Sequence, residues 1–550
     1  MDQQTTTTTG IEVGEFTSAP EKFLGVSISE MVRHWALTTP DAVAFVSPDS
    51  RVTWAEYDAA ADRVASALAA LPDVHAPVAL YLPDTMVFHA ALCGAYRAGR
   101  IAVGIGSRSG IKELAHLMDR SGCRTLITTE TLRGQDNTAL IDELCSRAGI
   151  PDNVVFLDER GDVDVQVVDG PGARRSVPVS ARRFAATSPQ FCISDVSMLN
   201  STSGTTGLPK LVTQTEERWI AFSRVAAAAG RIGRGDVFFG AVPAPFGFGL
   251  WTSHFLPALL GAPNVVMERF HVDTMIDLLV SERVTVLNCV STQFKMLLRS
   301  EHGRTADLGA LRAMFTGGEA VPYSEALAFE ERTGAAVLQF YGSNETGAVS
   351  VTTVDDDPET RLRTCGHVID NMRVRVFDDA GAEVHGDLRR GQPGVNGPLM
   401  CHGYWDDDDA NSELYTDDGW MLLGDIVEID RDNRVRVVGR KADIIIRGGK
   451  NISAVEVEEF VRAHPAVVLV SVVGVEDELF GEKVCAVVVT EDGSDLPAAE
   501  LSGWLATNGV TREYIPEHVV TLEQLPMAPG GKVAKGEVKA LAAARLAAPV

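Results

Sequence analysis

The sequence predicts an α/β protein in which a large N-terminal region of packed subdomains is followed by a smaller domain. At 550 residues the chain is too long for one hydrophobic core, because a domain usually has about 150 residues. From Thr53 onward, apolar runs of strand length alternate with helical periodicity, which is typical of βαβ units and a largely parallel sheet. A second pattern starts after residue 441 and continues for about 110 residues, the size of a domain.

The elements of the N-terminal region follow one another in this alternation. Residues 53–71 have helical periodicity, residues 78–82 form a short apolar run typical of a strand, and residues 88–99 return to helical periodicity. The alternation repeats in three later segments, residues 121–129, 275–290 and 334–342. Residues 373–377 and 434–438 alternate apolar and polar side chains, so the end of this region is expected to be richer in β structure.

The C-terminal pattern consists of a helix, two strands and a second helix. These elements are predicted at residues 455–464, 467–475, 483–490 and 498–508. A charged stretch precedes them, so the domain boundary is placed near Lys441 and Ala442. The predicted divisions are a disordered tail at residues 1–20, an N-terminal domain at 21–441 and a C-terminal domain at 442–550.

Composition narrows the class of protein. With 45% hydrophobic and 23% charged residues, the chain resembles neither a disordered nor a disulfide-framework protein. A net charge of -26 argues against binding to nucleic acid or to an anionic membrane. Its 8 cysteines form no CxxC pair and are expected to be reduced thiols. We find no signal-peptide pattern and no membrane-spanning run, so a cytoplasmic location is expected.

A segment rich in serine, threonine and glycine, STSGTTGLPK, follows a predicted strand and runs from Ser201 to Lys210. Hydroxyl groups and closely approachable glycine amides bind phosphate oxygens, and a lysine adds positive charge. A plain polar turn is the alternative, but it rarely has this composition. A P-loop NTPase is excluded, because Pro209 precedes Lys210 and Leu211 follows it, whereas that motif requires Gly-Lys-Ser/Thr.

This segment, together with QFYGSNETG at residues 339–347 and PMAPGGK at residues 526–532, resembles the adenylate-forming (ANL) superfamily of acyl-CoA synthetases, AMP-dependent ligases, adenylation domains and luciferases. The resemblance runs in order along most of the chain. It implies an N-terminal AMP-binding domain and a small mobile C-terminal α+β lid domain that rotates between two half-reactions. It also implies ATP or acyl-AMP, Mg²⁺ and CoA as ligands.

The resemblance assigns catalytic and nucleotide-binding residues. Glu345 would ligate Mg²⁺, and Lys210 and Lys532 would act on the phosphates, with Lys532 stabilising charge at phosphorus. Tyr341 would face the adenine, and Asp425 would accept from the ribose hydroxyls. The other expected nucleotide-binding residues are Ser201, Thr202, Ser203, Gly204, Thr205, Thr206, Gly207, Gly318, Glu319, Gly342, Asn344 and Arg440.

The same resemblance places an acyl pocket and a CoA channel. Phe246 stands where many members have a histidine or an aromatic residue that closes the acyl pocket. The acyl pocket would be lined by Phe246, Gly247, Phe248, Trp251 and Gly317, although plain core packing is the alternative for these aromatic residues. The expected CoA channel residues are Gly448, Gly449 and Lys450, with the hinge at Ala442. Lys535 and Lys539 are expected on a solvated helix face.

Three positions depart from the family pattern. Asn344 replaces the threonine of YGxTE, Leu423 replaces the threonine before Gly-Asp, and Ala442 replaces the usual Asp or Lys of the hinge. One hypothesis is that Ala442 shifts the balance between the two domain orientations. Together the three changes leave open that adenylation is impaired while thioester formation is retained.

Three functions remain open. The first is an acyl-CoA ligase, an AMP-forming acid–thiol ligase for a bulky apolar or aromatic carboxylic acid; the pocket lacks the aspartate that holds an amino-acid ammonium group. The second is thioester formation from a preformed acyl-AMP supplied by a partner adenylating enzyme, and the third is a non-catalytic adenylate-binding protein. The departures point towards specialised metabolism. A homodimer, a carrier-protein thiol and the identity of the acid stay undecided.

Overall fold

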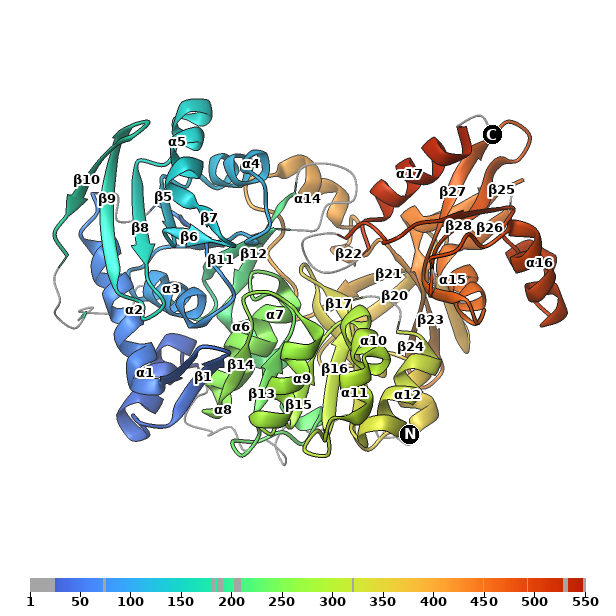
Figure 1. Cartoon of the computed structure of the whole chain (residues 1–550), viewed down its shortest axis with the longest axis horizontal. Helices are drawn as coiled ribbons and strands as arrows, with labels where there is room; N and C mark the ends of the chain where they lie inside the picture. Colours follow the sequence, from blue (N-terminus) through green and yellow to red (C-terminus); the bar gives the residue numbers. More distant parts are fainter. Residues whose placement is uncertain are drawn as a thin grey trace, which may run out of the picture.

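The computed structural model describes residues 25–72, 76–179, 184, 191–201, 209–318, 321–448, 450–491, 493–527 and 533–547. Two large sheets, each with helices on both faces, make up the N-terminal part, and two smaller sheets follow in the last third of the chain (Figure 1). The α/β class and the large-plus-small organisation predicted from the sequence are confirmed.

The first large sheet has eight strands. It is parallel in its centre, from β8 to β11, and antiparallel at both edges. In spatial order its strands are β10 (Ala173–Val177), β9 (Val163–Gly170), β8 (Asn153–Leu157), β5 (Thr125–Thr128), β3 (Val78–Tyr81), β4 (Ala102–Gly104), β11 (Val196–Ser201) and β12 (Leu211–Thr215). A short hairpin, β6 (Thr131–Leu132) and β7 (Gln135–Asp136), stands apart from it.

The second large sheet has nine strands and is parallel from β1 to β17. In spatial order its strands are β19 (His367–Val368), β18 (Gly347–Val351), β17 (Ala336–Ser343), β16 (Ala313–Gly317), β15 (Val286–Asn288), β13 (Phe238–Gly240), β14 (Asn264–Val266), β1 (Val43–Ser47) and β2 (Ser50–Thr53). Strands this short and almost wholly apolar are expected in a sheet that helices cover on both faces.

The helices form three layers around these sheets. The largest hydrophobic cluster lies between the sheets and includes α1 (Ile28–Thr38), α2 (Trp54–Ala69), α3 (Met86–Arg97), α6 (Glu216–Ala229), α7 (Gly247–Leu250) and α8 (Leu256–Leu260). The outer face of the first sheet packs on α4 (Ile111–Ser121) and α5 (Asn137–Ala148). The outer face of the second packs on α9 (Val272–Ser281), α10 (Ser291–Arg299), α12 (Tyr323–Thr333) and α13 (Pro358–Arg363), with α11 (Glu301–Thr305) beside α10.

Local sequence explains where these helices begin and end. Thr53 caps α2 through a capping box with Glu56, so the helix predicted at residues 53–71 begins at Trp54. Gly122 ends α4 in the left-handed conformation that glycine adopts easily. Between α7 and α8, a π-helical turn covers Trp251–Phe255 and carries His254 into the central layer. Such turns often occur at functional sites.

The C-terminal third contains the two smaller sheets. The first consists of β20 (Arg373–Phe377), β21 (Leu388–Asn396), β22 (Met421–Leu422), β23 (Asp425–Asp430) and β24 (Val435–Arg440), with α14 (Asp408–Leu414) between β21 and β22. The second consists of β25 (Ile444–Arg447), β26 (Lys450–Ser453), β27 (Val467–Asp477), β28 (Gly481–Thr490) and β29 (His518–Thr521). Its two faces pack on α15 (Ala454–Arg462) with α16 (Ala498–Thr507), and on α17 (Lys535–Ala547).

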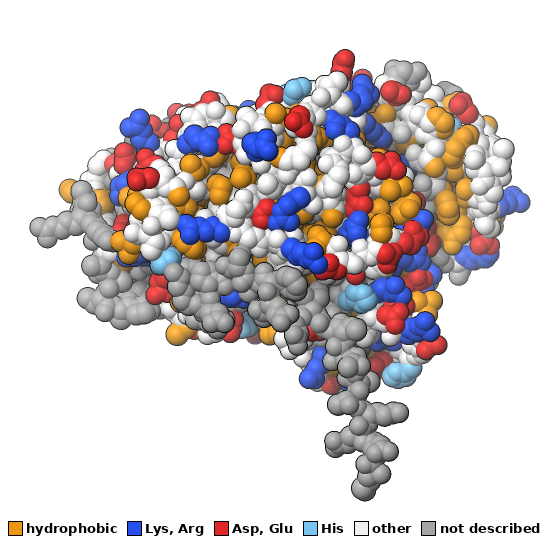
Figure 2. Space-filling view, turned by 90° about the horizontal axis from the view of Figure 1, so that it is seen from below, with side chains coloured by type: hydrophobic (Ala, Val, Ile, Leu, Met, Phe, Trp, Pro, Cys, Tyr) orange, Lys and Arg blue, Asp and Glu red, His pale blue; other side chains and the backbone are white. Residues whose placement is uncertain are grey.

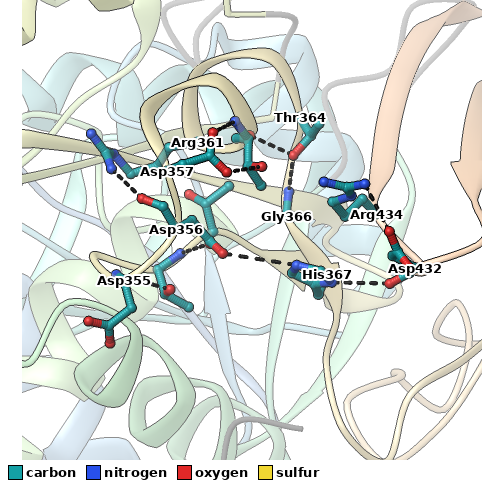
Figure 3. A network of polar contacts seen from close by, with 12 residues as sticks. Asp355, Asp356, Asp357, Arg361, Thr364, Gly366, His367, Asp432 and Arg434 are labelled. Atoms are coloured by element: carbon teal, nitrogen blue, oxygen red, sulfur yellow. Dashed lines mark hydrogen bonds and ion pairs between the residues drawn. The ribbon is translucent and has the colours of Figure 1, made fainter. Parts of the chain in front are cut away.

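A polar network fastens the β23–β24 hairpin to the edge of the nine-stranded sheet (Figure 3). His367 in β19 donates from Nδ1 to the carbonyl of Asp432 at 3.1 Å, and its Nε2 lies 3.9 Å from Asp356 Oδ1. Arg434 donates to the Asp432 carboxylate at 3.0 Å, and Arg361 donates to the Asp356 carbonyl at 2.7 Å. The network therefore joins the turn between β23 and β24 to β19 and to the segment around Asp356.

Surface charge is mixed on the face that Figure 2 shows, where acidic and basic side chains are interspersed despite the net charge of -26. Within the part of the chain that the structure describes, no helix is long and apolar enough to cross a membrane.

Candidate active site

Three residues that the sequence predicts for the nucleotide site meet at the end of β17. The Tyr341 hydroxyl donates to Asp425 Oδ2 at 2.9 Å, and Arg440 Nε lies 3.4 Å from Asp425 Oδ1. Asp425 and Arg440 are direct partners in the β23–β24 register, which explains the second contact. Burial, with the Asp425 charge beside it, raises the pKa of Tyr341 well above its usual value, so the phenol stays a donor. The carboxylate is thus held in place with lone pairs left to accept from vicinal hydroxyls.

Glu345 is held by a residue that the sequence analysis missed. The Tyr404 hydroxyl donates to Glu345 Oε1 at 2.9 Å, and Lys210 Nζ lies 4.8 Å from the centroid of the Tyr404 ring. Burial, with the Glu345 charge, raises the pKa of Tyr404 above its usual value. Tyr404 therefore brings two predicted catalytic residues together. Nothing in the sequence around Tyr404 distinguishes it from an ordinary surface tyrosine.

Arg218 in α6 supports the loop that carries Glu345, and the sequence analysis missed it too. Its guanidinium donates to the carbonyls of Asn344 at 2.9 Å, Glu345 at 3.1 Å and Leu399 at 2.7 Å, and to Gln214 Oε1 at 2.6 Å. Burial lowers the pKa of Arg218 to about 10, so it remains charged at neutral pH. A buried cation thus fixes the backbone on both sides of the proposed metal ligand.

Asn344 does more than replace a threonine. Its Oδ1 accepts from the Gly247 amide at 3.0 Å and from Asn200 Nδ2 at 3.4 Å, and its Nδ2 donates to the Ser201 carbonyl at 3.4 Å. A Cβ on Gly247 would lie 2.2 Å from Asn344 Oδ1, so this contact requires glycine. Asn344 therefore links the predicted acyl-pocket segment to the strand that leads into the phosphate loop.

The predicted acyl-pocket aromatics separate into two groups. Phe246 and Phe248 keep part of their surface exposed, whereas Trp251 is 1% exposed. Trp251 stacks behind Phe248 at 5.8 Å and meets Phe340 edge to face at 5.6 Å. Core packing, the alternative considered from the sequence, thus describes Trp251, while Phe246 and Phe248 keep the exposed surface that the predicted acyl pocket requires. We call Phe246, Gly247 and Phe248 the acyl wall.

Two glycines pack closely against aromatic residues of this region, Gly106 against Phe246 of the acyl wall and Gly317 against Phe340. A Cβ on Gly106 would lie 3.0 Å from the Phe246 ring, and a Cβ on Gly317 would lie 2.5 Å from the Phe340 carbonyl oxygen. Gly317 therefore belongs to the close packing of β16 on β17. Gly318 and Gly342, predicted for the nucleotide pocket, adjoin it: Gly318 follows β16, and Gly342 belongs to β17.

The predicted hinge and CoA channel lie apart from these residues. Ala442 is exposed in a short turn, Lys441–Asp443, and Gly448 connects β25 to β26, whose hairpin lies well away from β17 in Figure 1. The Gly448 amide donates to the Phe480 carbonyl at 2.8 Å, and Lys450 forms an ion pair with Glu513. Both partners, Phe480 and Glu513, therefore belong to the part of the chain that follows Ala442.

The environment of Lys535, near the predicted hinge, differs from the one predicted from the sequence. Lys535 was expected on a solvated face, but its side chain is only 23% exposed, and Nζ lies 3.1 Å from Asp443 and 3.2 Å from Glu458. Burial lowers the pKa of Lys535, but the Glu458 and Asp443 carboxylates outweigh it, and the net pKa is raised. Lys539 is exposed as expected and pairs with Glu482.

Several predicted site residues lie outside the described residues. They are Thr202, Ser203, Gly204, Thr205, Thr206, Gly207, Glu319, Gly449 and Lys532. Within the described part, no cluster of three His, Cys, Asp or Glu side chains could hold a metal ion by itself. A single carboxylate such as Glu345 still fits Mg²⁺, which proteins commonly bind through one or two carboxylates together with substrate phosphates.

Comparisons with known proteins identify the family. A family model described as AMP-binding enzyme matches residues 32–405, and one described as AMP-binding enzyme C-terminal domain matches residues 456–532. The chain is 33% identical to a medium-chain fatty-acid–CoA ligase of Escherichia coli over 337 residues, which cover 61% of this chain and only 59% of that protein. It is 30% identical to 3-[(3aS,4S,7aS)-7a-methyl-1,5-dioxo-octahydro-1H-inden-4-yl]propanoyl:CoA ligase of Mycobacterium tuberculosis, over 91% of this chain and 96% of that one.

Among solved structures, the anthranilate CoA ligase AuaEII in complex with anthranoyl-AMP has the same fold. The TM-score is 0.83 at 20% identity, over 96% of this chain and 99% of that one. The chain therefore belongs to the AMP-binding enzyme family and is, as its motifs predict, an adenylate-forming enzyme of the acid–thiol ligase class.

Proposed function

We propose that this enzyme is an acyl-CoA ligase for a bulky apolar or aromatic carboxylic acid that carries no α-amino group. The observation that carries the proposal is the Asp425 carboxylate held between Tyr341 and Arg440, a geometry suited to the ribose of an adenylate. The similarity to a ligase for a bulky bicyclic propanoate, which extends over almost the whole chain, supports the acid class.

The reaction would proceed in two steps. The acid carboxylate attacks the α-phosphorus of ATP and releases pyrophosphate, and the CoA thiol then attacks the acyl carbonyl and releases AMP. Glu345 would hold Mg²⁺, which neutralises phosphate charge, while Lys210 and Lys532 would stabilise the charge at phosphorus. The chain's own contribution is to orient Asp425 and Glu345 through Tyr341 and Tyr404.

The acyl wall supports an apolar acid. Phe246 and Phe248 present aromatic surface, and Trp251 with Phe340 packs behind Phe248. An aromatic or alicyclic ring would bury apolar area against that wall, at about 25 cal/mol per Å². An α-ammonium group would need a carboxylate partner there, and neither Phe246 nor Phe248 supplies one.

We also propose the domain division that the sequence predicts. The N-terminal domain ends near residue 441, and residues 442–550 form the lid, which turns at Ala442 between the two steps. This proposal is supported by the exposed turn at Lys441–Asp443, after which a separate sheet begins at β25. The lid would bring Gly448, Gly449 and Lys450 to the CoA channel.

A second candidate function is thioester formation from a preformed acyl-AMP. It is favoured by Asn344, whose amide is engaged by backbone groups, and by Leu423, which is buried and offers no hydroxyl group. In that case a partner enzyme would supply the adenylate. A non-catalytic adenylate-binding protein would keep the fold but form no product.

The test is a mass-resolved product assay on the purified protein. A panel of apolar acids is supplied with Mg-ATP, with and without CoA, beside a chemically made acyl-AMP supplied with CoA alone. Acyl-CoA from acid, ATP and CoA is the expected result. Thioester from the acyl-AMP alone would replace the first proposal with the second, and tight adenylate binding without any product would contradict both.

A further inference from the structure

Three buried titratable side chains lie behind the acyl wall, and the proposed chemistry does not use them. Asp84 precedes α3, His89 lies in α3, and His254 lies in the π-helical turn after Trp251. Their exposed fractions are 7%, 0% and 2%. Polar groups this deeply buried are costly unless they are paired, so their arrangement calls for a role.

The three side chains form a chain of contacts. Asp84 Oδ2 accepts from the Ala244 amide at 3.2 Å, and Asp84 Oδ1 lies 3.6 Å from His89 Nε2. Within the described structure, neither of those last two atoms has a hydrogen-bond partner. His89 Nδ1 lies 3.3 Å from His254 Nδ1, and the two rings stack at 5.4 Å with an interplanar angle of 10°.

The contact between the two Nδ1 atoms determines which ring nitrogens of His89 and His254 can carry a proton. One imidazole must donate and the other accept, so the two neutral rings have opposite tautomers. If His254 donates, His89 carries its proton on Nε2 and presents it to an ionised Asp84. If His89 donates, its bare Nε2 faces Asp84, which must then be the protonated carboxylic acid. The protonation state of Asp84 therefore selects the tautomers of both histidines.

The surroundings keep the histidines neutral. Burial raises the pKa of Asp84 to about 7 and lowers that of His89 to about 3, while burial and then His89 lower that of His254 well below its usual value. Of these three groups, Asp84 is therefore the one whose pKa lies near neutral pH.

At pH 7 and below, the titratable groups around the chain of contacts are mainly neutral as well. Tyr57 of α2 donates to the His89 carbonyl at 3.4 Å and contacts Cys93 of α3, and burial raises the pKa of both. Tyr96 of α3 and Glu216 of α6 line, with His254, a cavity of about 10 Å³, which has room for about one water molecule. Burial raises the pKa of Glu216 to about 8 and that of Tyr96 above its usual value.

The nearest charged groups are paired with one another. Arg97 of α3 donates to the Asp58 carboxylate at 2.6 Å and to the Asp62 carboxylate at 2.8 Å. Arg33 of α1 pairs with the same two carboxylates, so two positive and two negative charges compensate one another locally.

We propose that Asp84 is a positioning residue for the acyl wall: it accepts from the Ala244 amide, faces the stacked pair of His89 and His254, and selects between the two tautomer arrangements of that pair by gaining or losing a proton. Ala244 lies two residues before Phe246, and His254 lies three residues after Trp251. The three side chains therefore hold both ends of the segment that carries the acyl wall. The inference rests on the proposed function, because it takes Phe246 and Phe248 as the surface that the acid contacts.

The kinetic test compares Asp84→Ala, Asp84→Asn and, as a control, Asp119→Asn on the exposed face of α4. We expect Asp84→Ala to raise the KM for the acid at least tenfold and to leave the KM for ATP unchanged. Asp84→Asn can accept from Ala244 and donate to His89, so it should rescue the KM and make it independent of pH between 6 and 8, where that of the parent varies. Equal effects of Ala and Asn, or a KM for ATP that shifts as much as that for the acid, would overturn the proposal.

A second measurement needs no substrate. In protein labelled with ¹⁵N-histidine, the ring nitrogen shifts of His89 and His254, assigned with His89→Gln and His254→Gln, are followed from pH 6 to 8. We expect both rings to exchange tautomer without becoming protonated, and Asp84→Asn to abolish the change. Constant shifts, or protonation of either ring, would overturn the inference. A tautomer exchange in a protein that ligates no acid would instead contradict only the proposed function.

Discussion

The nucleotide side of the site and the acyl wall are held by different forces. On the nucleotide side, Asp425 and Glu345 are partly exposed carboxylates, each held by a tyrosine hydroxyl at 2.9 Å. The acyl wall is held by aromatic packing and by two side chains that accept hydrogen bonds from the backbone of its segment. Asn344 accepts from the Gly247 amide, and Asp84 accepts from the Ala244 amide. The carboxylates of the nucleotide side can thus be predicted from residue type and motif. The side chains that support the acyl wall can be identified only from their contacts in the structure.

The largest expected effect is on the nucleotide side. Asp425→Ala should lower kcat/KM for ATP about 100-fold, because it removes an anionic acceptor for two hydroxyls, a loss of about 3 kcal/mol. Initial rates of pyrophosphate release measure it, with Glu428→Gln on the same strand as the control. An unchanged kcat/KM in a folded Asp425→Ala protein would mean that the ribose is bound elsewhere.

The next effect concerns Arg218, which supports the backbone of Asn344 beside the acyl wall and of Glu345 on the nucleotide side. Arg218→Met leaves the carbonyls of Asn344, Glu345 and Leu399 without their buried donor, and each unsatisfied group costs about 1–3 kcal/mol. We expect the midpoint of thermal unfolding to fall by several degrees and ligase activity to fall with it. Calorimetry measures the midpoint, with Glu217→Gln, a change at an exposed neighbour in α6, as the control. An unaltered midpoint in Arg218→Met would show that Arg218 does not stabilise this backbone.

A smaller effect tests the link between the two sides. Gly247→Ala places a Cβ 2.2 Å from Asn344 Oδ1, so the KM for the acid should rise about tenfold. In an Asn344→Thr background the added methyl group meets a shorter side chain, and the penalty should shrink. A double-mutant cycle measures this coupling, expected near 1 kcal/mol. If the two changes are additive, Asn344 does not position the acyl wall.

The last effect is on stability alone, through its dependence on pH. Burial raises the pKa of Glu216 from 4.5 to about 8, so the folded state holds a proton that the unfolded state loses above about pH 4.5. Stability therefore falls as pH rises from about 4.5 to 8. Glu216→Gln should match the parent near pH 4.5 and be more stable at pH 8, as measured by the midpoint of urea unfolding. A constant difference across that range would contradict the assigned titration.

The sequence predicted the fold class, the family and the residues that meet around Asp425, because these depend on periodicity and on contiguous motifs. Tyr404 and Arg218 could not be predicted, since they reach Glu345 from 59 and 127 positions away, and Tyr and Arg are common in other roles. His89 likewise resembles a core histidine until His254, 165 positions away, is placed against it. Lys535 was predicted wrongly because a helix-face pattern does not reveal that Asp443 and Glu458 pack over it.

The domain boundary, the roles of Phe246 and Phe248 and the function of Ala442 remain predictions. For the boundary, the structure shows an exposed turn followed by a separate sheet, and for Phe248 it shows ring contacts with Trp251 and Phe340. For Ala442 it shows only that the side chain is exposed. The assay proposed above also tests the phosphate-binding roles predicted for Lys210 and Lys532.

The contact of Gly317 with Phe340 limits how the enzyme can be redesigned. A side chain at Gly317 would collide with the backbone of the neighbouring strand, so this position offers no route to new substrates. Phe248 has partly exposed surface and Trp251 behind it, and trimming Phe248 would open space without moving a strand. Under the proposed function, a library aimed at new acids should therefore vary Phe246 and Phe248 and leave Gly317 unchanged.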